Sequence, residues 1–258
     1  MFQQFIHWFK TRTYPGRCWQ RYNDYAKLCA TSGYIPEVRH WLLGPTRLFM
    51  RLWRYVQLGK TRFFGAENLA VNQRVIFCGN HSSFFDAIVM HPDLKGVVRY
   101  MGAYESMSGI CGLKQIALTA IGAFPVDRTR GKTVIAPAIN LLVSGQRLMI
   151  YPEGKIDNSG KLGPFKLGPA IIAMAAHKEL QGKQPVGIVP FHIHYHKRNV
   201  KTGNTFNYLK MGFSWRGGIT VYVGKPIWVH EHPELNPEQF MALVRSKILE
   251  MQFTAESK

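Results

Sequence analysis

The first segment whose residue types could do chemistry is NHSSFFD at residues 80–86, which follows an apolar run at residues 75–79. His81 stands five residues before Asp86, and a helix that starts at Ser83 would let the imidazole fold back towards that carboxylate. The carboxylate would accept a hydrogen bond from one ring nitrogen, fix the tautomer and leave the other nitrogen as a base. A positioned general base contributes roughly 10²–10⁴-fold to a rate.

The same segment also has a purely structural interpretation. Ser83 could cap a helix, and Asp86 three residues later would complete a capping box at a position that the helix dipole favours. That interpretation accounts for Asp86 without any chemistry, but it does not account for His81. The spacing His-x4-Asp therefore leaves both interpretations open.

Three further apolar runs end in residues that could bind or shape a substrate. In an α/β sheet, reactive side chains usually lie where a strand ends. Each run also has an ordinary explanation, namely a surface ion pair, a turn that needs a glycine, or a core strand. The runs are residues 122–128 (GAFPVDR), 148–155 (LMIYPEGK) and 186–191 (VGIVPF), with Asp127, Arg128, Glu153, Gly154, Lys155 and Pro190 as their distinctive residues.

From residue 61 onward, strand-like and helix-like patterns alternate, which is typical of an α/β fold. We expect a mixed, mostly parallel sheet flanked by helices. The expected strands are residues 75–79, 97–102, 122–126, 147–151, 186–195 and 218–223, and the expected helices are residues 84–91, 108–119, 134–144, 167–178 and 237–251.

Residues 1–60 are aromatic and basic, and we expect them to form a helical membrane-docking segment. Helical spacing in residues 36–60 places Leu48, Leu52 and Trp53 on one face and the arginines mostly on the other, and residues 1–12 also place apolar residues at helical spacing. This pattern is typical of a helix lying in a membrane interface. Each basic residue near anionic lipid contributes roughly 1 kcal/mol. The alternative is a helix whose apolar face packs on the protein's own core and whose basic face is solvated.

The charge of the whole chain limits its partners. It has 33 Lys and Arg against 15 Asp and Glu, a net charge of +18, which attracts nucleic acid, anionic lipid or an acidic substrate. Its four cysteines lack C-x-x-C spacing, which favours a reducing compartment over a zinc or disulfide framework. With neither a signal-peptide pattern nor about 20 consecutive apolar residues, we expect a peripheral protein on the cytoplasmic side of a membrane.

Taken in order, the four segments resemble the motif blocks of the glycerolipid acyltransferases, which acylate glycerol 3-phosphate and 1-acylglycerol 3-phosphate. Residues 80–86 are similar to Asn-His-x4-Asp, and residues 122–128 to Gly-x4-Asp-Arg. Residues 151–154 are similar to Phe/Tyr-Pro-Glu-Gly, and the run that ends at Pro190 is similar to the fourth block. The resemblance covers about residues 75–191 and implies an acyltransferase domain at residues 61–258.

The resemblance implies an O-acyltransferase of phospholipid biosynthesis that needs no metal or other cofactor. His81 would be the general base and Asp86 would orient it. The donor would be acyl-CoA or acyl carrier protein, and the acceptor a lysophospholipid at an anionic membrane, above all 1-acylglycerol 3-phosphate, which gives phosphatidic acid. Ile156 stands where the family has an Arg, so another lysolipid or hydroxy-lipid stays open as acceptor. The residues implied in substrate binding are Asn80, Arg128, Glu153, Gly154, Lys155, Lys166 and Pro190.

Other functional classes rest on single features. His192, His194 and His196 would face one side of a strand, as zinc ligands can, although a basic strand end explains them too. The charge alone would also suit a nucleic-acid-binding module, but no recognition motif supports one, and we expect no nucleic-acid partner. A hydrolase in which His81 activates water is a further alternative, but the sequence has no Gly-x-Ser-x-Gly elbow that would supply a serine nucleophile. A membrane scaffold with an inactive site also remains an alternative. The oligomeric state is open.

Overall fold

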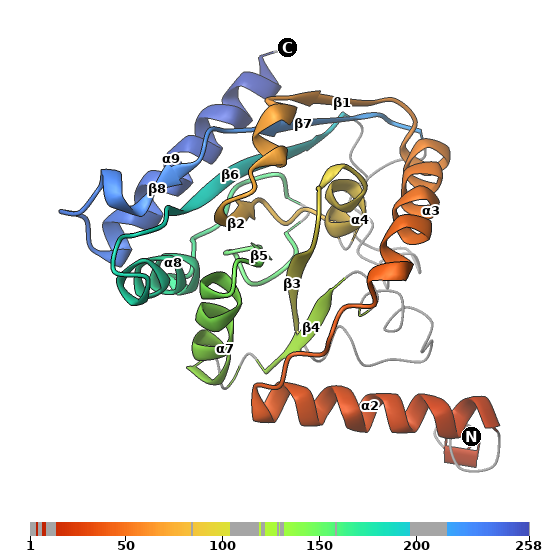
Figure 1. Cartoon of the computed structure of the whole chain (residues 1–258). Helices are drawn as coiled ribbons and strands as arrows, with labels where there is room; N and C mark the ends of the chain where they lie inside the picture. The colour runs from red at the N-terminus through yellow and green to blue at the C-terminus, as the bar shows by residue number, and fades with distance from the viewer. Residues whose placement is uncertain are drawn as a thin grey trace.

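A mixed sheet forms the centre of the protein, as its sequence predicts. The computed structural model describes residues 4, 7–8, 14–83, 85–103, 119, 122–127, 129, 132–157, 159–196 and 216–257. Within these ranges the sheet has eight strands in the order β1-β7-β6-β2-β5-β3-β4, and β8 pairs with β6 (Figure 1). The strands are β1 Thr61–Phe64, β2 Arg74–Gly79, β3 Val98–Ala103, β4 Ala123–Val126, β5 Arg147–Ile150, β6 Val186–Tyr195, β7 Ile219–Val223 and β8 Ile227–Trp228.

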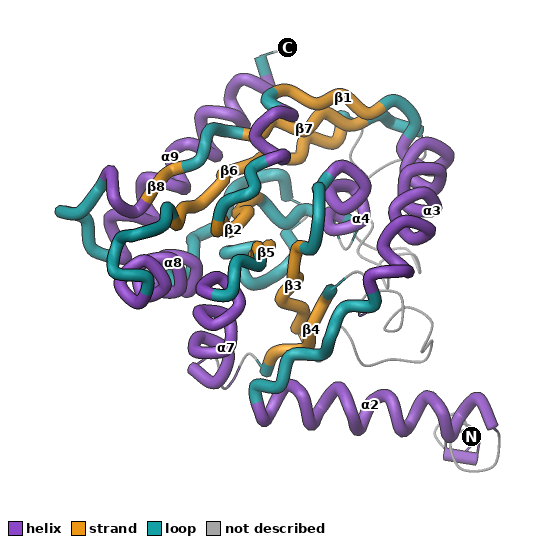
Figure 2. Tube along the Cα trace, in the orientation of Figure 1, coloured by secondary structure: helices purple, strands orange, loops and turns teal. Residues whose placement is uncertain are grey.

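The described strand pairs are parallel except where β7 and β8 run antiparallel to β6. The α-helices are α2 Tyr14–Ser32, α3 His40–Leu58, α4 Asp86–Met90, α7 Lys132–Val143, α8 Gly168–Glu179 and α9 Pro237–Glu256. Helices cover both faces of the sheet (Figure 2). Alternate side chains of a central strand are therefore buried in different layers: in β2, Phe77 packs with α3 and α4 on one face, whereas Ile76 packs with α7, α8 and α9 on the other.

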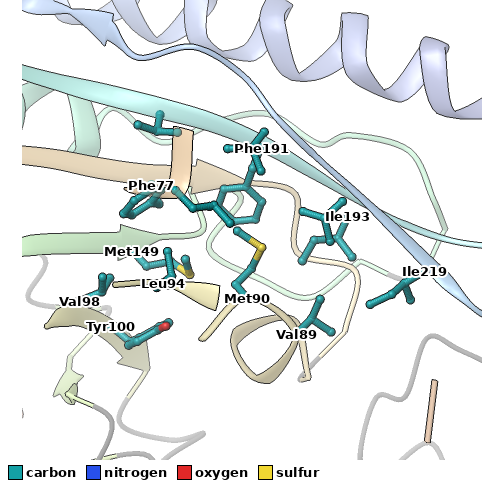
Figure 3. Packing of buried hydrophobic residues seen from close by; sticks show 14 of the residues in the cluster. Phe77, Val89, Met90, Leu94, Val98, Tyr100, Met149, Phe191, Ile193 and Ile219 are labelled. Atoms are coloured by element: carbon teal, nitrogen blue, oxygen red, sulfur yellow. The ribbon is translucent and has the colours of Figure 1, made fainter. Parts of the chain in front are cut away.

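The layer beneath residues 80–86 is a dense apolar cluster. Phe77 of β2, Met149 of β5 and Phe191 of β6 meet Val89 and Met90 of α4 there (Figure 3). These side chains are at most 1% exposed, so α4 is held against the central strands by tight packing. The end of β2 and the start of α4 are thereby fixed relative to each other.

Most expected elements are present, with ends shifted by one to a few residues. Strands β1 and β8 were not expected, because they are too short to show periodicity in the sequence. The expected helix at residues 84–91 is shortened to α4 and followed by a 3-10 turn, η2 His91–Asp93. Ser83 as its N-cap was wrong, since the N-cap position is Phe85 and has no side-chain cap. The helix expected at residues 108–119 lies outside the described residues, apart from Thr119, and so does most of residues 1–12.

Helix α3 packs on the protein through a mixed face, in which Leu43, Met50 and Leu58 are buried together with Arg54. Leu48 and Leu52, which the alternative interpretation packs on the core, are exposed instead. Arg54 is buried and donates to Val89 O and to Asp93 Oδ2, each at 2.5 Å. Arg51 donates to Pro92 O at 2.9 Å, and Arg47 donates to the carbonyl of Gly96. Six large apolar residues of α3 are exposed, namely Trp41, Leu48, Phe49, Leu52, Tyr55 and Val56.

Both α2 and α3 contact the sheet domain. Helix α2 packs against β4 (Figure 1), and the hydroxyls of Tyr22 and Thr119 are 2.8 Å apart. Helix α3 packs on α4 and η2. Over the described ranges, no helix is long and apolar enough to cross a bilayer. The division at residue 60 stays a prediction.

Candidate active site

Asn80 fixes the end of β2 to the neighbouring strand β6. Its side-chain oxygen accepts from Ile193 N at 2.8 Å, and its side-chain nitrogen donates to Ile193 O and to Ser82 Oγ, both at 3.0 Å. Asn80 is 4% exposed, so these contacts satisfy an otherwise costly buried amide. The residue that follows, His81, therefore leaves the sheet from a rigid point.

His81 and Asp86 form the pair that their spacing predicts. His81 Nδ1 lies 2.9 Å from Asp86 Oδ2, and the Asp86 side chain is fully buried, whereas that of His81 is 20% exposed. Within the described part of the chain, Nε2 of His81 has no hydrogen-bond partner. A carboxylate on Nδ1 fixes the tautomer in which Nε2 can accept a proton.

Asp86 accepts two further hydrogen bonds. Ser83 N donates to Oδ2 at 2.9 Å, as the acid of a capping box would receive it, and Ser83 Oγ accepts from Phe85 N at 3.2 Å. The Tyr195 hydroxyl donates to Oδ1 at 2.6 Å. Asp86 therefore accepts from three donors, which stabilise its charge in the interior although Ser83 is not the N-cap of α4.

Sequence reasoning missed Tyr195 as a site residue. Its signal was the alternation in β6, which places Phe191, Ile193 and Tyr195 on the face that packs against α4, the helix that begins at Asp86. The spacing of the motif blocks could not identify it, because the contact depends on the register between β2 and β6.

Glu153 holds the main chain of His81 in place. Its Oε1 accepts from His81 N at 2.8 Å and its Oε2 accepts from Gly163 N at 3.1 Å, while Asp157 N donates to His81 O at 2.8 Å. Burial raises the pKa of Glu153, and the two backbone donors partly offset this. The third motif block is thereby joined to the first through the backbone of His81.

Tyr151 supports the imidazole from one side. The two rings are stacked with centroids 4.2 Å apart and an interplanar angle of 16°, and Phe191 meets Tyr151 edge-on at 6.0 Å. Burial, followed by the charge of Asp86, raises the pKa of Tyr151 well above its usual range. The phenol therefore stays neutral, and the stack restricts rotation of the His81 ring.

His81 and Tyr151 line a cavity of about 550 Å³. Its walls come from β3, β4, β5, α7 and α8 and are mainly apolar, with Met101, Val126 and Ile172 among the lining residues. An elongated apolar group fits a cavity of this composition. The predicted base therefore stands at the wall of a space that can hold a hydrocarbon chain.

Two predicted binding lysines also line this cavity. Lys155 and Lys166 are exposed, and Lys166 crosses Gly154 so closely that a Cβ there would lie 2.7 Å from Lys166 Cε. Gly154 also has φ +67°, a backbone conformation that residues with a side chain rarely adopt. Both the close Lys166 side chain and the positive φ therefore require glycine at this position. Ile156 lines the cavity beside them.

The other predicted residues are placed differently. Asp127 lines the cavity and accepts from the backbone N–H and the hydroxyl of Thr129, while Arg128 lies outside the described residues. Pro190 lies in β6, away from the cavity lining, and its carbonyl accepts from Gly224 N in the gap between β7 and β8. A proline is tolerated there because its missing N–H would face that gap.

The histidines of β6 do not belong to this site. His196 Nε2 lies 2.9 Å from Thr220 Oγ1, and His192 and His194 also point to the face opposite Tyr195. Among the described residues, no group of three or more His, Cys, Asp or Glu side chains is arranged to hold a metal ion.

Comparison with known proteins defines the class of this chain. Residues 60–194 match the sequence model of the family described as Acyltransferase, which is more than half of the chain. The chain therefore belongs to the acyltransferase family.

The relatives and the solved structure agree with this assignment. The chain is 26% identical over 187 residues to the chloroplast 1-acyl-sn-glycerol-3-phosphate acyltransferase BAT2 of Brassica napus, an alignment of 69% of this chain and 49% of the relative. It is 25% identical over 186 residues to LPAT1 of Arabidopsis thaliana, with coverage of 69% and 47%. The chain thus spans about half the length of the curated relatives it matches. The crystal structure of the 1-acyl-sn-glycerophosphate acyltransferase PlsC from Thermotoga maritima has a similar fold, with a TM-score of 0.64, 16% identity and coverage of 91% and 89% of the two chains.

Proposed function

We propose that this protein transfers a fatty acyl group from acyl-CoA or acyl carrier protein to the hydroxyl of a lysophospholipid. The favoured acceptor is 1-acylglycerol 3-phosphate, and the product is then phosphatidic acid. The observation that carries the proposal is the His81–Asp86 pair, 2.9 Å apart, at the wall of a 550 Å³ apolar cavity. Family membership and the names of the relatives support the same reaction class.

In this mechanism, Nε2 of His81 takes the proton of the acceptor hydroxyl as its oxygen attacks the thioester carbonyl carbon. The tetrahedral intermediate then collapses, the carbon–sulfur bond breaks, and the departing thiolate receives the proton from the imidazolium. Asp86 stabilises the imidazolium while it exists. The attack is direct, so no acyl-enzyme forms.

The acyl chain would occupy the apolar cavity, and the acceptor phosphate would meet Lys155 and Lys166 beside Gly154. Arg128 would add a bidentate contact to the same phosphate. Asn80, Glu153 and Pro190 would contribute by shaping the site, since the described polar contacts of these residues are with the protein's own chain. Because the ammonium group of a lysine is a point charge, Lys155 and Lys166 would also be compatible with headgroups other than a simple phosphate.

The exposed apolar face of α3 would dock the protein on the cytoplasmic surface of an anionic membrane, from which the lysolipid enters. Aromatic and aliphatic side chains facing outward on a helix are suited to the headgroup boundary of a bilayer. Arg47, Arg51 and Arg54 bond the helix to the protein, so the attraction to anionic lipid would come mainly from the remaining basic residues. Residues 1–60 would thus be the docking segment of an acyltransferase domain at residues 61–258.

The test is an acyl-transfer assay with the purified full chain. Long-chain acyl-CoA and acyl carrier protein thioesters are each supplied with vesicles that contain one lysolipid, and products are identified by mass spectrometry. We expect an acylated phospholipid, with 1-acylglycerol 3-phosphate as the best acceptor. Transfer to another lysolipid alone would correct the acceptor, and no transfer to any acceptor would overturn the proposal.

A further inference from the structure

We propose that Tyr195 is a positioning residue that sets the proton affinity of the His81–Asp86 pair through its hydroxyl. This role rests on the proposed function, because it concerns the base of that reaction. Its basis is the 2.6 Å hydrogen bond from the Tyr195 hydroxyl to Asp86 Oδ1. Tyr195 lies one residue beyond the matched range 60–194, so the family comparison does not cover it.

The fold fixes the position of this phenol. Asn80 binds both the N–H and the carbonyl of Ile193, two residues before Tyr195 on the same face of β6. The strand that carries Tyr195 is therefore tied directly to the residue before His81. Tyr195 is 1% exposed, so its ring has no freedom to move away from Asp86.

The phenol is a permanent donor at working pH. Burial is the main cause that raises the pKa of Tyr195 well above its usual range, and the charge of Asp86 adds to it. A hydrogen bond from the Ser83 side chain acts in the opposite direction. Tyr195 therefore stays protonated, and its proton is directed to Asp86 Oδ1.

Several other titratable and charged groups lie near the His81–Asp86 pair, and they are the same in wild type and in Y195F. Tyr151 stacks on His81 from the end of β5, and Glu153 contacts the His81 backbone. Asp127, Lys155 and Lys166 line the cavity that His81 lines, and Asp157 donates its N–H to the His81 carbonyl. Substitution of Tyr195 by Phe leaves all of these in place, so a change in proton affinity would come from the lost hydroxyl.

Loss of this donor has a definite direction. A hydrogen bond to a carboxylate stabilises its charged form, so without it the Asp86 carboxylate attracts protons more strongly. His81 then holds its proton more tightly, and the neutral imidazole that accepts the substrate proton is populated only at higher pH. Protonation of Asp86 itself would also remove activity at low pH, so both routes move the acidic limb of the rate profile upward.

The experiment measures kcat/KM against pH for wild type and Y195F, and it follows the imidazole of His81 by NMR titration in the same proteins. We expect the acidic limb and the imidazole midpoint to move up by about one pH unit in Y195F. The matched control is Y222F, which removes a phenol from the opposite face of the sheet, and it should move neither. In a D86N background, Y195F should add no further shift of the limb, because its effect passes through Asp86.

The outcomes separate this inference from the proposed function. An active Y195F with an unchanged limb and an unchanged imidazole midpoint overturns the inference and leaves the acyltransferase reaction standing. A wild-type protein without acyl transfer overturns the proposed function, while the NMR midpoint still decides the role of Tyr195. A shift of the same size in Y222F would also contradict the role inferred for Tyr195.

Discussion

The indole of Trp53 stacks on the ring of Phe85, with centroids 4.6 Å apart and an interplanar angle of 20°. Trp53 belongs to α3, whereas Phe85 directly precedes the buried carboxylate of Asp86. The helix with the exposed apolar face therefore rests on the segment that carries the predicted base. A lipid surface under α3 would lie next to the site.

This relationship predicts that outward-facing apolar residues of α3 control access to lipid. Leu48→Glu combined with Leu52→Glu should lower binding to anionic vesicles at least about tenfold, because two apolar contacts become charged. Acyl transfer from vesicles should fall in parallel, while transfer in detergent should persist. Vesicle flotation and the two assays check this.

The matched control for α3 is Phe253→Glu, since Phe253 is 67% exposed but belongs to α9. It should leave vesicle binding unchanged. If the double variant of α3 binds vesicles as well as wild type does, α3 is not the docking helix.

Glu153→Gln tests whether Glu153 positions His81 or binds the acceptor. An amide has one acceptor oxygen, so its NH₂ group would face either His81 N–H or Gly163 N–H. We expect kcat to fall about tenfold, with the KM values of both substrates nearly unchanged. Steady-state kinetics separate the two roles, because a rise in acceptor KM at constant kcat would assign Glu153 to substrate binding. Glu179→Gln, an exposed carboxylate of α8, is the control.

Ile156→Arg tests the headgroup side of the cavity. Ile156 lines it together with Lys155 and Lys166, and an added guanidinium there could bind a phosphate bidentately. The KM for 1-acylglycerol 3-phosphate should fall about tenfold while that of an uncharged acceptor stays constant. Ile156→Met keeps the site apolar and should change neither. An unchanged KM for the phosphate acceptor in Ile156→Arg would place the headgroup elsewhere.

The buried His91 should make the free energy of unfolding decrease in acid. Burial, with a contribution from the Arg47 charge, lowers the pKa of His91 to about 3, and its Nδ1 lies 2.9 Å from the Tyr100 hydroxyl. The unfolded chain binds the proton first as the pH falls below about 6.5, so folding stability decreases from there towards pH 3. Between pH 6.5 and 5 the loss should be about 2 kcal/mol.

Urea unfolding at several pH values measures this slope in wild type and His91→Gln. The variant lacks the titrating group, so its free energy of unfolding should depend less on pH over this range, whatever its absolute stability. Equal slopes in the two proteins would contradict the assignment to His91.

The sequence predicts strands such as β2 and β6 well because buried parallel strands are long apolar runs with clear ends. It also predicts the His81–Asp86 pair, since the two residues are only five positions apart in one short segment. It could not predict the contacts of Tyr195 or of Glu153 with Gly163, which depend on strand register and loop path.

The orientation of α3 shows a different limit of sequence reasoning. An amphipathic pattern defines two faces but does not say which one meets the protein. Arg54 faces inward because Val89 O and the Asp93 carboxylate accept its hydrogen bonds there, and neither acceptor is visible in the pattern of α3 itself.

The most direct test of the central claim is the acyl-transfer rate of His81→Ala against wild type, with 1-acylglycerol 3-phosphate in vesicles and long-chain thioester donors. His230→Ala, an exposed histidine away from the cavity lining, serves as control. If His81 is the general base, kcat should fall roughly 10²–10⁴-fold in His81→Ala with its fold retained, and His230→Ala should keep the wild-type rate. A folded His81→Ala protein that transfers acyl groups at the wild-type rate would rule out His81 as the general base.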